Sequence, residues 1–168
     1  MKLYTWHYDS PLGRMTLESD GMSLIGLRFD GQNRFGAPFP EPLSTAESSL
    51  PVFEETCRWL DIYFQGGIPD FTPALTLHGS DFQQVVWKIL LEIPYGETVT
   101  YGWIAGRLAA ERGSGRMSAQ AVGSAVGRNP VALIVPCHRV IGAGGRLTGY
   151  AAGLDRKAWL LAHEQAIR

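Results

Sequence analysis

Residues 131–140, VALIVPCHRV, place an apolar run directly before a cysteine and a histidine. An unbroken run of aliphatic and β-branched residues is typical of a buried, extended segment. Pro136 lacks a backbone N–H and resists helix formation, so we expect the chain to leave the core there, with Cys137 at the boundary between core and surface. The arrangement favours a nucleophilic thiol displayed from a rigid element. The alternative, a small buried hydrophobic cysteine, stays open on this stretch alone.

The composition is that of a globular chain. Its 168 residues are 45% apolar, enough for one compact unit or two small ones. No stretch of about 18 apolar residues is present, and the first residues lack the plan of a signal peptide. We therefore expect a cytoplasmic protein that does not enter a membrane. Two cysteines are too few for a disulfide framework, and no histidine pairs with them as in a zinc site, so we expect no disulfide, metal or cofactor.

The net charge of −1 hides an asymmetry between the two halves of the chain. Residues 1–78 contain five Lys or Arg against ten Asp or Glu, whereas residues 79–168 contain ten against six. Eight of the basic residues lie between Arg107 and Lys157, around the Cys137 stretch. This concentration predicts a polyanionic partner for the second half. A basic surface without a partner is the alternative.

The first half predicts a small antiparallel sheet. Alternation of apolar and polar residues indicates three paired strands joined by turns, over 3–8, 15–18 and 24–29. A proline-rich loop is expected from Gly31 to about Thr45.

An amphipathic helix is predicted after this loop, because Pro51 suits a helix start and Gly66-Gly67 a stop. Cys57 lies on its apolar stripe and is predicted to be core. A linker over 68–79 then ends an N-terminal α/β domain, residues 1–78.

The second half, residues 79–168, predicts a mostly helical domain, which makes the whole chain α+β. Ser80 and Gln83 form a capping box for a helix that Pro94 stops. Two further helices, over about 100–110 and 118–127, flank the turn Gly113-Ser114-Gly115 in a helix-turn-helix layout.

The helix over 118–127 is almost without bulky side chains, and glycines in its interior cost about 1 kcal/mol each relative to alanine. Val122 and Val126 are spaced as a buried seam. The thin remainder favours either close packing against another helix or entry into a narrow groove, such as the minor groove of DNA.

Glu164 follows an apolar pattern on the last helix, in which Leu154, Ala158 and Leu161 form one seam. Because Glu164 lies one turn after Leu160 and Leu161, it is predicted to face inward. A carboxylate that faces a core needs a partner. A solvated last turn is the alternative.

Five separated blocks of the second half carry a resemblance to a known family. The blocks, over 98–105, 120–130, 136–140, 148–150 and 159–164, resemble in order and spacing the O6-alkylguanine-DNA alkyltransferases, also called methylated-DNA-protein-cysteine methyltransferases. The first half resembles their ribonuclease H-like domain only in general plan.

The resemblance implies a single-turnover reaction on the protein itself. Cys137 would attack the alkyl carbon on guanine O6, and by extension on thymine O4, and keep the group as a thioether. His138 would act on the thiol through a water, and Glu164 would fix the imidazole. Tyr101 would help to rotate the nucleotide out and would protonate the leaving guanine at N3. Asn129 would brace the helix-turn-helix against the segment that carries the thiol.

The resemblance also implies how DNA is held, by one monomer whose thin helix enters the minor groove while the damaged base is flipped out. The residues that contact DNA would be Gln120, Ala121, Gly123, Ser124, Arg128 and Arg139. The alkylguanine pocket would be formed by Val140, Tyr150, Ala151 and Ala152.

Two positions depart from the pattern of the family. Gln120 stands where many relatives carry the arginine that fills the gap left by the extruded base, so we expect extrusion to persist but to be slower. Ala152 replaces a frequent glycine and is predicted to narrow the pocket.

Two other function classes fit the same residues. The first is a DNA-binding regulator whose function lies in its helix-turn-helix and whose cysteine senses redox state. The second is a cysteine hydrolase built on Cys137, His138 and Glu164. An irreversible gain of mass on Cys137 after exposure to alkylated DNA separates the family reading from both.

Overall fold

The computed structural model describes residues 3–32, 44–45, 50–113 and 117–165. The chain divides into two compact units, the first formed by residues 1–79 with 130–134 and the second by residues 80–129 with 135–168. The predicted α+β class is confirmed, with a sheet in the first unit and helices in the second. One segment departs from the predicted domain bounds, because residues 130–134 belong to the first unit.

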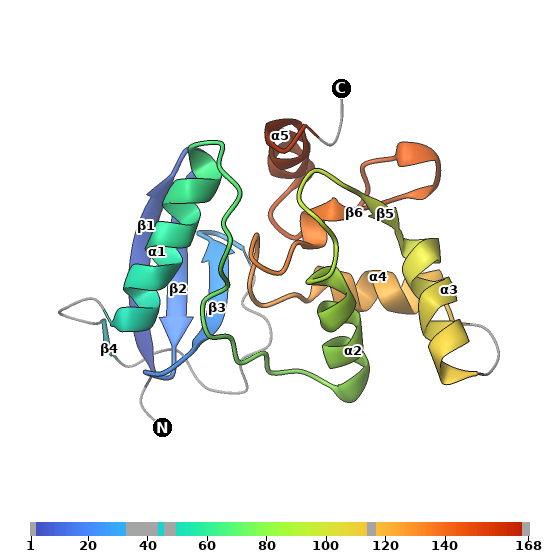
Figure 1. Ribbon diagram of the computed structural model, residues 1–168, viewed down its shortest axis with the longest axis horizontal. Coiled ribbons are helices and arrows are strands. Elements are labelled where there is room, and N and C mark those ends of the chain that lie inside the picture. Colours follow the sequence, from blue (N-terminus) through green and yellow to red (C-terminus); the bar gives the residue numbers. More distant parts are fainter. Residues whose placement is uncertain (1–2, 33–43, 46–49, 114–116, 166–168) are drawn as a thin grey trace. The chain divides into compact units, whose positions relative to one another are not determined.

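The first unit is a sheet covered by one helix (Figure 1). Strands β1 (Tyr4–Ser10), β2 (Gly13–Ser19) and β3 (Leu24–Phe29) pair antiparallel as predicted. A short fourth strand, β4 (Ser44–Thr45), pairs parallel to β1, so the order is β3-β2-β1-β4. This strand was expected to be loop, because two residues are too few to show an alternating pattern.

Helix α1 (Pro51–Phe64) begins at the proline that the sequence indicates. Its buried stripe consists of Val52, Phe53, Thr56, Trp59, Leu60 and Tyr63. Cys57 is only partly buried, so its prediction as a core residue is wrong.

Residues 130–134 add backbone hydrogen bonds to the edge of the sheet at β3. Leu27 donates to the carbonyl of Pro130 at 2.9 Å and accepts from the N–H of Ala132 at 2.9 Å. The apolar run is buried, as predicted, but it is a tight turn and not an extended segment. Leu133 takes φ 68°, and the N–H of Ile134 reaches back to the carbonyl of Ala132 at 2.8 Å. Aliphatic composition shows burial but not this reversal of direction.

The second unit consists of helices with two short strands between them. Helices α2 (Asp81–Leu90), α3 (Tyr101–Arg112) and α4 (Ala119–Gly127) precede the cysteine, and α5 (Leu154–His163) follows it. Strands β5 (Val99–Thr100) and β6 (Val140–Ile141) pair parallel. Two single 3-10 turns complete the unit, η1 (Cys137–Arg139) and η2 (Ala143–Gly145). Among the described residues, no helix has the length and apolar character needed to cross a membrane.

The predicted capping box of α2 is confirmed. The N–H of Gln83 donates to the Ser80 hydroxyl at 3.2 Å, and the N–H of Ser80 donates to the Gln83 side chain at 3.0 Å. Helix α2 ends at Leu90, before Pro94.

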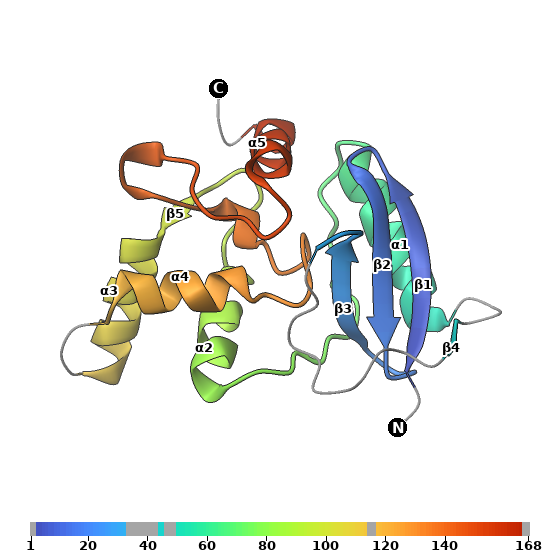
Figure 2. The ribbon, with the colours of Figure 1, turned by 180° about the vertical axis from the view of Figure 1, so that it is seen from behind.

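Helix α4 packs against both α2 and α3 (Figure 2). Val122 and Val126 are buried, which confirms the predicted seam. The indole N–H of Trp87 on α2 donates to the carbonyl of Ala125 at 2.8 Å, and both residues are buried. This bond ties the last turn of α4 to α2.

Substitution of Trp87 by Phe tests that tie. The variant loses the hydrogen bond and part of the buried ring, so we expect the free energy of unfolding to fall by about 2 kcal/mol. Urea denaturation followed by far-ultraviolet circular dichroism measures the change. The matched control is Trp103→Phe, because Trp103 is 50% exposed, and we expect a change within about 0.5 kcal/mol. Equal losses in the two variants would contradict a specific role for Trp87.

Candidate active site

Cys137 begins the single turn η1 directly after Pro136. Its N–H donates to the carbonyl of Val135 at 2.8 Å. The residue as a whole is partly exposed, whereas Val135 before it and His138 after it are buried. The thiol therefore lies where the core meets the surface, as the sequence predicts.

Asn129 connects the end of α4 to the segment that carries the cysteine. The side chain is buried, and its Nδ2 donates to the carbonyl of Val135 at 2.7 Å. A side-chain hydrogen bond from Asn129 to Cys137 also lowers the pKa of the thiol.

The Cys137 thiol is protonated in the resting site. Burial raises its pKa above the usual range, while the amide of Asn129 and the positive charge of Lys157 lower it to a smaller extent. The thiol therefore needs a proton acceptor to become a nucleophile.

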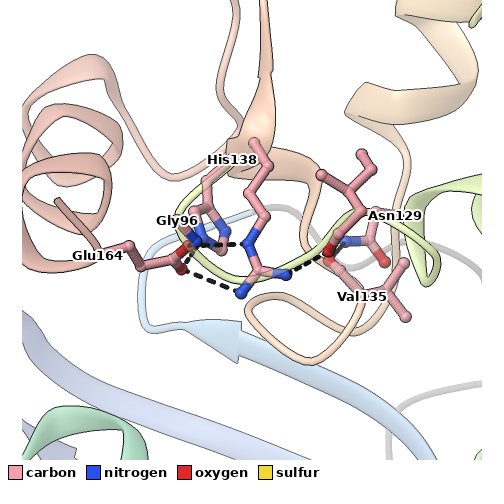
Figure 3. A network of polar contacts seen from close by, with 7 residues as sticks. Gly96, Asn129, Val135, His138 and Glu164 are labelled. Atoms are coloured by element: carbon pink, nitrogen blue, oxygen red, sulfur yellow. Dashed lines mark hydrogen bonds and ion pairs between the residues drawn. The ribbon is translucent and has the colours of Figure 1, made fainter. Parts of the chain in front are cut away.

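His138 and Glu164 form a buried pair (Figure 3). His138 Nε2 lies 2.6 Å from Glu164 Oε2. Burial lowers the pKa of His138 below its usual range despite this carboxylate, so the imidazole is neutral near pH 7. Because an ionised carboxylate only accepts hydrogen bonds, Nε2 carries the proton and Nδ1 keeps its lone pair. Nδ1 is buried and has no hydrogen-bond partner within the described part of the chain, so it is the free basic atom of the site.

Arg139 binds the same carboxylate from the other side. Its Nε donates to Glu164 Oε1 at 2.8 Å, its Nη2 to Oε2 at 3.2 Å, and its Nη1 to the carbonyl of Ile93 at 2.7 Å. The N–H of Gly96 adds a bond to Oε1 at 3.1 Å. The hydrogen bonds from His138 and Arg139 hold the pKa of Glu164 far below its usual range, against the opposing effect of burial.

This arrangement corrects one prediction about a charged residue and confirms another. Arg139 was predicted to contact DNA, but its guanidinium is buried and occupied by Glu164 and Ile93. Glu164 faces inward with partners, as predicted, and a solvated last turn is ruled out. The seam that led to it is partly wrong, since Leu154 is 48% exposed.

Tyr101, the first residue of α3, reaches the loop after η2. Its hydroxyl donates to the carbonyl of Thr148 at 3.2 Å. Burial, and secondarily the negative charge that Cys137 can carry, raise the pKa of Tyr101, while the Thr148 contact opposes this. Tyr101 thus keeps its proton at neutral pH and can donate it.

Tyr150 stands in the same loop with its hydroxyl buried. That hydroxyl has no hydrogen-bond partner among the described residues. Burial and the neighbouring Cys137 raise its pKa well above the usual range.

Helix α4 presents two different faces. Val122, Ala125 and Val126 are buried, whereas the predicted DNA-contacting positions Gln120, Ala121, Ser124 and Arg128 are exposed. Gly123 lies at the edge of the exposed face, and a Cβ there would lie 3.7 Å from the Tyr101 ring. The exposed face of α4 therefore adjoins Tyr101.

The predicted pocket residues differ in exposure. Val140 is buried, Ala152 is 9% exposed and Ala151 is exposed. The carbonyl of Val140 accepts a hydrogen bond from Lys157 Nζ at 2.6 Å. Among the described residues, no group of three or more His, Cys, Asp or Glu side chains could hold a metal ion.

Lys157 is the residue of this site that sequence reasoning missed. Its side chain is fully buried on α5. The available signal was its helical spacing, because Lys157 lies three and four residues before the buried Leu160 and Leu161 and thus shares their face.

Comparison with known proteins identifies the family. The family model described as the ribonuclease-like domain of 6-O-methylguanine DNA methyltransferase matches residues 3–77, and the one for its DNA binding domain matches residues 81–166. A methylated-DNA–protein-cysteine methyltransferase of Mycobacterium bovis is 46% identical over 164 residues, covering 95% of this chain and 93% of the relative. One of Methanosarcina acetivorans is 44% identical over 160 residues, with 95% and 96% covered.

The chain belongs to the methylated-DNA–protein-cysteine methyltransferases. Its structure is similar to crystal structures of Mycobacterium tuberculosis OGT. A variant form with one arginine replaced by lysine gives a TM-score of 0.82 at 43% identity, covering 98% of this chain and 93% of the other. The form in complex with DNA gives 0.79 at 44% identity, covering 99% and 94%.

Within this methyltransferase, the structure brings most of the predicted site residues together in the second unit. Asn129 and Tyr101 influence Cys137 through a hydrogen bond or through charge, and His138, the next residue in the chain, bonds to Glu164. Arg139 joins the inner network, and the exposed residues of α4 form a separate surface beside Tyr101.

Substitution of Glu164 by Gln tests the buried network. The amide leaves the buried guanidinium of Arg139 without its counter-charge, so we expect the free energy of unfolding at neutral pH to fall by about 3 kcal/mol. The double variant Glu164→Gln/Arg139→Met should regain part of this loss, because it removes both charges. Urea denaturation of the single and double variants measures the coupling, and an unchanged stability of Glu164→Gln would contradict it.

The lowered pKa of Glu164 also predicts that the protein loses stability at acid pH. Because the folded-state pKa of Glu164 is lowered, its stabilisation is complete above the unfolded-state pKa of about 4.3 and is lost as pH falls below it. Glu164→Gln should therefore lose less stability than the parent between about pH 5 and pH 3. Equal losses in the free energy of unfolding with falling pH, in the parent and in the variant, would contradict this contribution of Glu164.

Proposed function

We propose that Cys137 is the residue that accepts the alkyl group in this protein, from O6 of guanine and also from O4 of thymine. Members of this family repair DNA by transfer of the group to one of their own cysteines, and so does this chain. The observation that carries the assignment is the position of Cys137, a partly exposed residue whose thiol is within the influence of Asn129, Lys157, Tyr101 and Tyr150. Cys57 lacks such an environment, since burial and Asp61 raise its pKa to about 11.

The transfer is balanced by two proton movements. The thiol proton passes, through one water, to the free Nδ1 of His138, and the carboxylate of Glu164 stabilises the resulting imidazolium. The sulfur electron pair then forms the S–C bond to the alkyl carbon. The C–O6 bond breaks, its electrons pass to guanine, and a proton from the Tyr101 hydroxyl neutralises N3. The product is a thioether, so each molecule acts once.

Activation of the thiol supplies only a small part of the rate. A thiol pKa reduced from about 8.5 to about 7 would raise the thiolate fraction at neutral pH roughly fifteenfold. Because a less basic thiolate is a weaker nucleophile, about fivefold of this gain in rate is lost again. Positioning contributes on the order of 7–11 kcal/mol, and proton donation by Tyr101 offsets the charge of the leaving guanine. The fixed backbone around Cys137 therefore matters more than the thiolate fraction.

In this proposal, DNA binds to the exposed face of α4. Side chains as small as Ala121, Gly123 and Ser124 leave the helix thin enough for a minor groove about 6 Å wide. Gln120 lies at the helix start, where its side chain would occupy the stack as the base is flipped out, and Arg128 lies at the other end, where it would meet a phosphate. The flipped alkylguanine would pack on the Tyr150 ring, with its exocyclic amine on the carbonyls of Cys137 and Val140 and its O6 on the N–H of Ala151. Ala152 would limit the bulk of the alkyl group.

In this proposal, the protein acts as a monomer in the cytoplasm. All of these residues belong to one unit of one chain, so no second copy is needed to complete the site. A reducing compartment keeps Cys137 as a free thiol.

The two rival functions fit the site less well. A redox sensor needs a thiol of low pKa, whereas burial raises that of Cys137. A hydrolase needs a base that bonds directly to its nucleophile, whereas the proton-bearing nitrogen of His138 is bonded to Glu164 and its other nitrogen has no partner in the described residues.

The acceptor is tested with the two cysteines in parallel. Cys137→Ala should bind a methylguanine duplex with nearly unchanged affinity but accept no methyl group, whereas Cys57→Ser should become methylated at the parental rate. Intact mass spectrometry after incubation reads out both variants. Folded Cys57→Ser protein that fails to gain the methyl group would show that the assignment is wrong.

Base extrusion is tested at Gln120. Gln120→Ala should slow transfer from duplex DNA about fivefold, equivalent to ~1 kcal/mol, because the side chain assists extrusion. Transfer from free O6-methylguanine should not change, and Gln120→Arg should accelerate the duplex reaction alone. Single-turnover rates on both substrates decide this, and equal slowing on both would exclude the role.

A further inference from the structure

The ammonium group of Lys157 is buried among backbone carbonyls. The residue is 0% exposed, and its Nζ donates to the carbonyls of Val140 at 2.6 Å and Thr148 at 2.8 Å, with Gly149 at 3.4 Å. No ion pair joins Lys157 to any carboxylate of the described residues. A buried cation without a carboxylate is costly, which indicates that its charge has a use in the site.

The carbonyls that Lys157 holds belong to segments on both sides of the thiol. Val140 directly follows the turn that carries Cys137, and Thr148 lies in the same loop as Tyr150. The Thr148 carbonyl also accepts the Tyr101 hydroxyl at 3.2 Å, and Lys157 Nζ lies 5.9 Å from the centre of the Tyr101 ring. One ammonium group thus fixes the thiol segment, the pocket loop and the partner of Tyr101 relative to one another.

The other charges near the thiol are already balanced. Arg139 and Glu164 neutralise each other through two hydrogen bonds, and burial keeps His138 neutral by lowering its pKa. The positive charge that lowers the pKa of the Cys137 thiol is that of Lys157. The influence is mutual, since Cys137 raises the pKa of Lys157 while burial lowers it to about 8.

We propose that Lys157 is a positioning residue for alkyl transfer, whose ammonium group joins the Val140 and Thr148 carbonyls and supplies the charge that balances the Cys137 thiolate. The proposal rests on Cys137 as the acceptor. It goes beyond the Cys137–His138–Glu164 relay, because it assigns the counter-charge of the nucleophile to α5.

Several other charged or titratable groups surround Lys157 and Cys137. The variants that test pH dependence must therefore leave these groups unchanged. The groups are Tyr101 on α3, His138 and Arg139 on η1, Tyr150 in the following loop, and Arg156 and Glu164 at the two ends of α5.

The first experiment titrates the thiol directly, in a Cys57→Ser background so that one thiol remains. Lys157→Met keeps the length and apolar stem of the side chain but removes the charge. Its thiolate midpoint, read from ultraviolet absorbance and from the rate of iodoacetamide labelling, should rise by about one pH unit. Transfer from free O6-methylguanine should fall about threefold near neutral pH, because a more basic thiolate is a better nucleophile and offsets part of the lost thiolate fraction, and the loss should shrink at high pH.

The matched control is Lys88→Met, because Lys88 is exposed on α2, and it should leave both the midpoint and the rate unchanged. Lys157→Arg keeps the charge and should keep the midpoint closer to that of the parent than Lys157→Met does. A folded Lys157→Met variant with the parental midpoint would overturn the proposal, as would a rate loss that is equal at every pH.

A second measurement leaves Lys157 in place and decides the question even if Lys157→Met does not fold. NMR titration of the lysine ε-methylene groups should give a lower pKa for Lys157 in Cys137→Ala, and in the methylated protein, than in the parent, because coupling between two sites is reciprocal. An unchanged pKa would overturn the proposal. Neither titration uses DNA, so a protein that shows the coupling but takes no methyl group from DNA would refute the proposed function alone.

Discussion

The carboxylate of Glu164 is the group on which the C-terminal unit depends. It joins the end of α5 to the turn that carries the cysteine, through His138 and Arg139, and to the segment after α2, through Gly96. Inside a protein such a charge is tolerated only when its hydrogen bonds are complete. The same bonds fix which nitrogen of His138 carries the proton. One interaction therefore sets both the stability of the unit and the chemical state of its base.

The site contains two buried cations that are compensated differently. Arg139 is paired with a carboxylate, so its charge is neutralised and its role is structural. Lys157 is held by carbonyl dipoles, which solvate the ammonium group without cancelling its charge. Positive charge therefore remains available beside the thiol. Two basic residues of the second half of the sequence thus lie inside the protein and not on a DNA-facing surface.

Helix α4 meets two opposing demands. Apart from Gln120, its outer face has small side chains, so the position of the helix depends on Val122, Val126 and the bond from Trp87 to Ala125. Asn129, two residues after the end of the helix, donates a hydrogen bond to the carbonyl of Val135 and so fixes the backbone before Cys137 relative to α4. The surface proposed to bind DNA and the reactive thiol are in this way connected by buried hydrogen bonds.

Local patterns in the sequence determined the strands, the starts of α1 and α2, the buried seam of α4 and the inward side of Glu164, because alternation, capping residues and helical spacing act over a few neighbours. Only the tertiary structure decided the turn at residues 130–134, the pairing of β4, the partial exposure of Cys57, and the burial of Arg139 and Lys157. Arginine and lysine are usually exposed, so no local pattern predicts that a carboxylate 25 residues from Arg139, or carbonyls 17 and 9 residues from Lys157, will enclose them. Those partners exist only once α5 has packed against the turn at Cys137, and that is why the decisive charges of the site could not be read from the chain alone.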